Sequence, residues 1–107
     1  RYGYAVTTHG GDDAGFNLGT EIVKFDLNGG RTNVCKLGKG RFPSEAAFAA
    51  AGAGEDEGYL LAIVYDAAKD GSEFIVLDAK DIARGPVARV ALPQRVPFGF
   101  HAAWFGD

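Results

Sequence analysis

The sequence has no methionine, a single cysteine (Cys35) and only two histidines among its 107 residues. One cysteine cannot form an internal disulfide framework, so we expect a reducing compartment and a cytoplasmic location. With 11 Lys and Arg against 14 Asp and Glu, and no basic cluster, nucleic acid is not an expected partner. The longest strongly apolar run, residues 59–65, is far too short to cross a bilayer. Because position 1 is not Met and the chain starts in the strand-like Arg1-Tyr2-Gly3-Tyr4, we interpret it as part of a longer protein.

Hydrophobic residues make up 47% of the chain, which is enough for a packed core. Sixteen glycines punctuate short apolar segments, a rhythm typical of an all-β fold. The sequence Asn28-Gly29-Gly30 predicts a tight hairpin turn, because Asn-Gly tolerates the positive φ that such turns require. The segments expected to form strands are 2–8, 20–27, 31–37, 59–65, 74–77, 87–92 and 98–105.

The stretch 44–54 is ambiguous, and local propensity alone leans to a helix because of its alanines and a possible N-cap at Ser44. Residues 78–85 predict one helical turn that stops at Gly85. The order of strands and turns looks like one four-stranded blade with partial neighbours. Segments 59–65 and 74–77 are apolar on both faces, so each needs a packing partner on both sides, which again indicates a fragment.

Two histidines are candidates for metal chemistry. His9 lies in a glycine-rich loop near Asp12 and Asp13, but loops of this composition are commonplace, so a metal role is not favoured there. His101 is flanked by Phe100 and by Ala102 in an apolar segment, and the local sequence favours a core histidine over a metal ligand. Any metal centre at His101 would need further ligands from polypeptide outside residues 1–107.

Glu45 is placed oddly among alanines. A glutamate there either faces water or accepts a hydrogen bond from a buried donor, and orienting a metal-bound histidine is a chemically natural role for it. The run Glu55-Asp56-Glu57 is interpreted as a solvated turn. Cys35 lies in an expected strand, where its neighbour Lys36 points to the opposite face, and no histidine is near it in the sequence, so we expect the thiol to be inert.

From residue 42 onward the order of short motifs is specific. Glu45-Ala46-Ala47-Phe48 is followed by the Glu55–Leu61 run, by Val64-Tyr65-Asp66, by Val76-Leu77-Asp78-Ala79 and by Gly85-Pro86-Val87-Ala88, and the series ends in Leu92-Pro93-Gln94-Arg95-Val96-Pro97-Phe98-Gly99-Phe100-His101. This succession resembles the C-terminal end of the carotenoid oxygenase family, which contains the carotenoid-cleavage and lignostilbene-type dioxygenases. The segment before residue 42 resembles the family more loosely.

The resemblance implies a fold and a metal site. Members of the family are seven-bladed β-propellers with a non-haem Fe(II) on the axis, held by four histidines from inner strands. His101 matches the histidine of the terminal Gly-Phe-His motif, and Glu45 matches the glutamate of a Glu-Pro-x-Phe-Val motif that contacts such a ligand. Ala46 and Ala49 stand where that motif has Pro and Val. The resemblance also implies that the first part of 44–54 is an inner strand, and that Glu45 and His101 approach one another.

The implied function is cleavage of a conjugated carbon–carbon double bond of a carotenoid, apocarotenoid or stilbene by O₂, giving carbonyl products. Residues 1–107 would be the C-terminal portion of one propeller domain, about one to two blades, and would supply one iron ligand and no further catalytic group. The implied cofactor is Fe(II). The implied partners are an apolar polyene or stilbene, O₂, the blades N-terminal to this chain, and a membrane surface for the full protein. Two alternatives are a stand-alone β-rich binding module and a propeller that has lost its other ligands.

Overall fold

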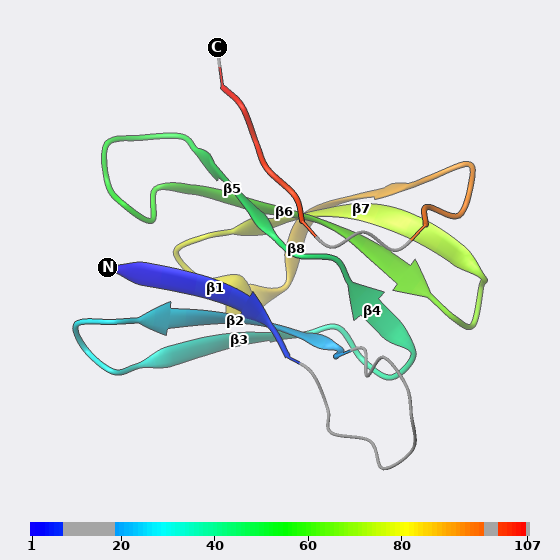
Figure 1. Ribbon diagram of the computed structural model, residues 1–107, viewed down its shortest axis with the longest axis horizontal. Coiled ribbons are helices and arrows are strands. Elements are labelled where there is room, and N and C mark those ends of the chain that lie inside the picture. The colour runs from blue at the N-terminus through cyan, green and yellow to red at the C-terminus, as the bar shows by residue number, and fades with distance from the viewer. Residues whose placement is uncertain (8–18, 98–100, 107) are drawn as a thin grey trace.

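The computed structural model describes residues 1–7, 19–97 and 101–106, which consist mainly of strands and turns (Figure 1). A first antiparallel sheet has the order β1 (Tyr2–Val6), β2 (Glu21–Asp26) and β3 (Thr32–Lys36). A second antiparallel sheet contains β4 (Arg41–Pro43), β5 (Ala47–Ala50), β6 (Gly58–Asp66), β7 (Gly71–Asp78) and β8 (Pro86–Ala91). A single 3₁₀ turn, η1 (Ile82–Arg84), lies between β7 and β8.

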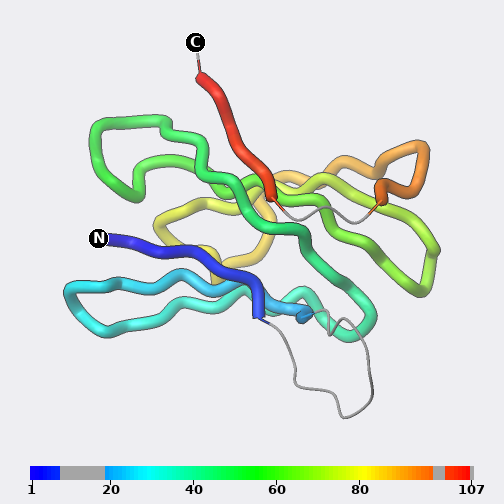
Figure 2. Tube along the Cα trace, viewed as in Figure 1, coloured from blue at the N-terminus to red at the C-terminus, as the bar shows by residue number. Residues whose placement is uncertain are grey.

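The second sheet is a four-position meander. Because β4 and β5 both pair with β6, they share the first position, and β6, β7 and β8 follow in order. The tube in Figure 2 shows this sheet above the three strands of the first one. A four-stranded antiparallel meander is the unit from which propeller blades are built. The blade expected from the sequence is therefore confirmed.

A hairpin joins β2 to β3, as the Asn28-Gly29-Gly30 sequence predicts. Its loop has more than the expected two residues, because the Asp26 N–H donates to the Arg31 carbonyl at 2.8 Å and closes a loop of residues 27–30. The Asp26 carboxylate accepts hydrogen bonds from the N–H groups of Asn28 and Gly29 at 3.1 and 3.2 Å. Only the last of the three turn residues, Gly30, has a positive φ, of 65°. Side-chain capping by Asp26 explains the longer loop.

Residues 47–50 form a strand, so the helix that local propensity favours for 44–54 is wrong, and a strand in this stretch, as the resemblance implies, is found. Pairing with β6 places Ala50 opposite Gly58. A Cβ atom on Gly58 would lie 2.3 Å from the Ala49 carbonyl oxygen and 2.9 Å from the Phe48 ring. Glycine permits this close approach of two strands, and the resulting pairing outweighs the helix propensity of alanine.

The other strand predictions have mixed outcomes. Strands β7 and β8 confirm the strands expected at 74–77 and 87–92, and η1 is the expected helical turn before Gly85, whose φ is 84°. The strand expected over 98–105 is not found: residues 101–106 have no regular secondary structure, and 98–100 lie outside the described residues. The apolar sequence of 101–106 suits a strand, but a strand also needs a neighbour to pair with, and the described sheets offer it none.

The core lies between the two sheets. Along β6 the side chains of Leu60, Ala62 and Val64 are buried, whereas those of Leu61 and Ile63 are only half-buried, so one face of the strand turns toward the first sheet. Both sheets contribute to one apolar cluster, which contains Ile22, Cys35, Leu37, Leu60, Ala62, Val64, Ile75, Leu77, Ala79 and Ile82. Burial raises the pKa of the Cys35 thiol, which agrees with the expectation that this cysteine is inert.

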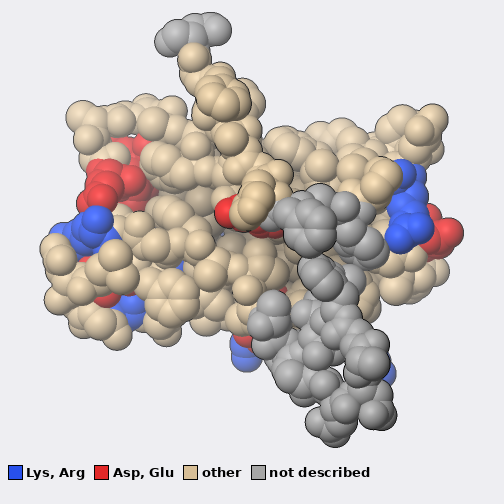
Figure 3. Space-filling model, in the orientation of Figure 1, with Lys and Arg blue, Asp and Glu red and all other residues tan. Residues whose placement is uncertain are grey.

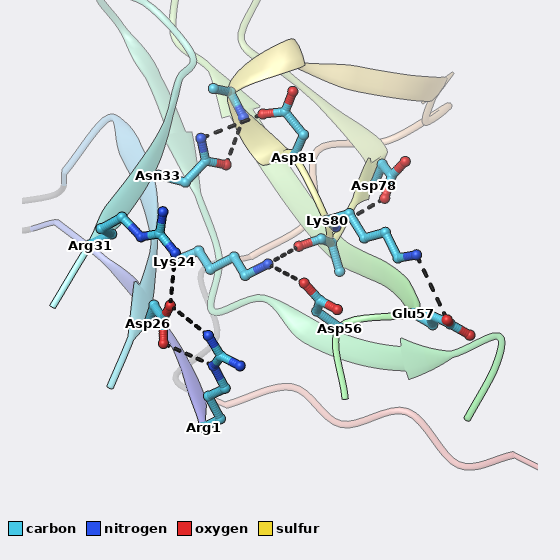
Figure 4. Close-up of polar contacts among 12 residues, drawn as sticks. Arg1, Lys24, Asp26, Arg31, Asn33, Asp56, Glu57, Asp78, Lys80 and Asp81 are labelled. Atoms are coloured by element: carbon cyan, nitrogen blue, oxygen red, sulfur yellow. Dashed lines mark hydrogen bonds and ion pairs between the residues drawn. The ribbon is translucent and has the colours of Figure 1, made fainter. Parts of the chain in front are cut away.

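A buried lysine connects the two sheets (Figure 4). The ammonium of Lys24 donates to the Asp56 carboxylate at 2.9 Å and to the Ala79 carbonyl at 2.7 Å, and it lies 4.2 Å from the centre of the Tyr2 ring. The side chain is 7% exposed, so these contacts replace the water that it has lost. The expectation of a merely solvated turn at 55–57 is therefore wrong for Asp56, which holds this lysine.

Several large apolar side chains remain exposed on both sheets, namely Phe25, Leu27, Tyr59, Val87 and Val90. The face drawn in Figure 3 is largely uncharged, and its Lys, Arg, Asp and Glu atoms gather mainly toward the two ends of the molecule. No helix in the described part of the chain is long and apolar enough to span a membrane.

Two ion pairs, one within the first sheet and one between the sheets, predict loss of stability in acid. Hydrogen bonds from Arg1 hold the pKa of Asp26 below its ordinary value, and a hydrogen bond from Lys24 does the same for Asp56. Since an unfolded Asp has a pKa of about 3.9, this stabilisation is fully present above that pH and is lost as the pH falls through the lower folded-state values. The urea concentration at half-unfolding should therefore decrease as the pH is lowered from 5 to 2, and it should decrease less steeply in the Asp26→Asn variant. Equal slopes in both proteins would contradict the prediction.

We also expect the isolated chain to self-associate, because Tyr59, Val87 and Val90 expose apolar area on a sheet whose last strand is an open edge. Size-exclusion chromatography with light scattering over a range of concentrations measures this association. Val90→Lys should weaken it, since a charge on an edge strand opposes pairing. A monomer at every concentration that unfolds in one sharp cooperative transition would contradict the expectation.

Candidate functional site

The first position of the second sheet contains a β-bulge between β4 and β5. Pro43 is opposite Val64, whereas Ala47 is opposite Leu61. Four steps along this side therefore correspond to three along β6, which means that one extra residue is inserted here. Such bulges bend the strand and aim a side chain away from its regular direction.

Ser44 keeps the bulge hydrogen-bonded. Its backbone N–H donates to the Ile63 carbonyl at 2.7 Å, and its hydroxyl oxygen accepts the Ile63 N–H at 3.0 Å. A side-chain oxygen thus takes the place that a strand carbonyl would have in a regular ladder. The next residue, Glu45, is consequently outside the alternation of the sheet, and its side chain is 48% exposed.

The bulge brings Glu45 close to His101, which lies near the C-terminal end of the chain. One carboxylate oxygen, Oε2 of Glu45, lies 2.9 Å from His101 Nδ1 and accepts the backbone N–H of Ala102 at 3.2 Å. Figure 2 shows the C-terminal segment, in red, beginning beside the chain of β5. Of the two alternatives for Glu45, the exposed position is the one found, because the hydrogen bonds that its carboxylate accepts come from exposed rather than buried donors.

The contact decides which imidazole nitrogen is available. An ionised carboxylate has no proton to donate, so the Nδ1 atom of His101 must carry the hydrogen of this bond. In the neutral ring, Nε2 then has a free lone pair. Fixing one nitrogen through a carboxylate is the usual way in which proteins orient a metal-binding imidazole. The pair Glu45–His101 is thus chemically suited to present a single metal ligand.

His101 is not a core residue of this chain, because its side chain is 89% exposed. The interpretation as a core histidine is therefore wrong here. No group of three or more His, Cys, Asp or Glu that could hold a metal occurs among residues 1–7, 19–97 and 101–106. An ion at His101 would take its other ligands from outside these residues.

Of the remaining candidates, only Cys35 lies in the part of the chain that the structure describes. His9, Asp12 and Asp13 lie outside the described residues. Cys35 is in the core between the sheets. Sequence reasoning missed two serines. Ser44 lies in the bulge, and the hydroxyl of Ser72 in β7 accepts a hydrogen bond from the Val96 N–H, shortly before His101. No sequence pattern distinguishes these serines, because each acts through its place in the sheet.

Comparisons with known proteins agree with this architecture. The model of the family described as retinal pigment epithelial membrane protein, RPE65, matches residues 1–106. The chain is 42% identical over 87 residues to the 9-cis-epoxycarotenoid dioxygenase NCED6 of Arabidopsis thaliana, an alignment that covers 80% of this chain and 15% of that protein.

Solved structures match the chain over almost its whole length. A variant of the Synechocystis apocarotenoid oxygenase has a TM-score of 0.85 at 29% identity, covering 100% of this chain and 22% of that structure. The lignostilbene dioxygenase of Pseudomonas brassicacearum has a TM-score of 0.86 at 25% identity, covering 99% of this chain and 24% of that structure.

The chain thus spans less than a quarter of the length of these relatives. The predicted fold class is confirmed, since the chain is all-β and corresponds to a fragment of a larger β-propeller oxygenase fold. The chain belongs to the RPE65 and carotenoid oxygenase family.

Proposed function

We propose that the full-length protein containing this chain is a non-haem Fe(II) dioxygenase that cleaves a conjugated carbon–carbon double bond of a carotenoid, apocarotenoid or stilbene with O₂. In this proposal His101 is one iron ligand and Glu45 is the residue that orients it. The observation that carries the proposal is the 2.9 Å contact between Glu45 Oε2 and His101 Nδ1. The relatives named as carotenoid, apocarotenoid and lignostilbene oxygenases support the reaction class.

The residues present fit one corner of such a site. Neutral imidazole is a suitable ligand for ferrous iron, and the carboxylate behind the ring makes Nε2 a better donor. The other ligands would come from the blades that precede this chain. The exposed apolar side chains of the two sheets support such neighbours.

Within the complete protein this chain would bind and orient rather than react. Ferrous iron, when bound, would supply the redox chemistry toward O₂ that amino-acid side chains lack. Glu45 would hold the hydrogen on His101 Nδ1, which leaves the lone pair of Nε2 for the metal. The hydrogen bond from the Ala102 N–H would keep the backbone of the ligand in place. We further propose a cytoplasmic location and contact of the complete protein with a membrane surface, from which apolar polyenes would be drawn.

Replacing His101 with Ala in the full-length protein should abolish cleavage and sharply lower bound iron, while circular dichroism stays unchanged. The reason is that the side chain is exposed and outside every strand of the sheets described here, so it contributes little to their stability. Elemental analysis gives the iron content. Phe105→Ala is a matched control, since Phe105 lies on the same segment and is 88% exposed. Full iron occupancy in the His101→Ala protein would refute the assignment.

Glu45→Gln should act more mildly than His101→Ala. The amide oxygen still accepts the hydrogen bonds from His101 and Ala102, but the negative charge that strengthens the ligand is gone. We expect an iron affinity lower by about tenfold to a hundredfold, the range usual for groups that orient metal ligands. Glu45→Ala, which also removes the hydrogen bonds, should lose more. Iron dissociation constants measured by competition with a chelator test this order. Equal affinity in the wild-type, Glu45→Gln and Glu45→Ala proteins would contradict it.

A further inference from the structure

The chain after β8 is attached to the second sheet at one buried serine. We call residues 92–97 the C-terminal connector. The Leu92 N–H donates to the Ser72 carbonyl at 2.9 Å, and the Val96 N–H donates to the Ser72 hydroxyl at 2.8 Å. Ser72 is 6% exposed. A single residue of β7 therefore accepts hydrogen bonds from both ends of the connector.

Arg95 gives the connector a second attachment, to Tyr65 and Asp70. The guanidinium of Arg95 lies 4.6 Å from the centre of the Tyr65 ring and 4.0 Å from the Asp70 carboxylate. The Tyr65 hydroxyl donates to Asp70 at 2.7 Å. Tyr65 is directly opposite Ser72 across β6 and β7. The connector thus contacts both members of one cross-strand pair, Tyr65 of β6 and Ser72 of β7.

The position of the connector limits where His101 lies. Only four residues lie between Val96 and His101. A shift of the connector by one residue corresponds to about 3.3 Å in extended backbone. A hydrogen bond with a donor–acceptor distance of about 2.9 Å does not survive such a displacement. The exposed pair of Glu45 and His101 is too weak to set this register by itself, because ion pairs in water contribute little.

We propose that Ser72 is a positioning residue for His101. Its buried hydroxyl fixes the register of the C-terminal connector, and this register delivers the imidazole to Glu45. The consequence for iron binding rests on the proposed function, whereas the consequence for the position of the chain does not.

The test compares three variants of the full-length protein. Ser72→Ala removes the acceptor of the Val96 N–H, Ser72→Thr keeps a hydroxyl, and Cys35→Ala removes one buried heavy atom from the other sheet as a control. Hydrogen exchange of peptides covering 92–106, followed by mass spectrometry in iron-free protein, reports the connector. Competition with a chelator reports the iron affinity.

We expect faster exchange over 92–106 and about tenfold weaker iron binding in Ser72→Ala, with both restored in Ser72→Thr and neither changed in Cys35→Ala. Unchanged exchange in Ser72→Ala would overturn the proposal. So would faster exchange with unaltered iron affinity, provided that His101→Ala loses its iron. If His101→Ala also keeps its iron, the proposed function has failed, while faster exchange in Ser72→Ala still supports the role of Ser72 in placing the chain.

Discussion

The β-bulge between β4 and β5 is the constraint on which the candidate site depends. In a regular ladder, Glu45 would take its turn in the alternation of the strand. The extra residue takes it out of that alternation, while Ser44 supplies the hydrogen bond that the interrupted ladder would lose. A carboxylate from the first position of the blade then meets an imidazole from the end of the chain. Bulges frequently occur beside functional sites for this reason.

The remainder of the fold holds this arrangement without taking part in it. The apolar layer between the sheets fixes β6, the strand against which both β4 and β5 are aligned. Lys24 of the first sheet donates hydrogen bonds to the Asp56 carboxylate and to the Ala79 carbonyl, which belong to the turns of the second sheet. These contacts of Lys24 involve neither Glu45 nor His101.

The sequence predicted the sheet better than it predicted the site. Alternating apolar residues along β6 and the short apolar segment of β7 identify strands directly, because burial on a sheet follows a period of two. Residues 47–50 were ambiguous, since alanine favours a helix and the pairing that overrides it depends on Gly58, eight residues further on than Ala50. The local sequence made His101 and Glu45 candidates, but only the resemblance of their motifs to a family favoured a metal ligand over a core histidine and brought the two residues together. Ser44 and Ser72 have no such motif, and their roles depend on cross-strand positions.

The central claim is that His101 presents Nε2 to iron while Glu45 holds Nδ1. A crystal structure of the iron-loaded full-length protein, with anomalous scattering recorded at the iron absorption edge, tests it most directly. The account predicts an anomalous peak within bonding distance of His101 Nε2, with the Nδ1 contact to Glu45 retained. A peak elsewhere in the protein, or one on the Nδ1 side of the ring, would contradict it.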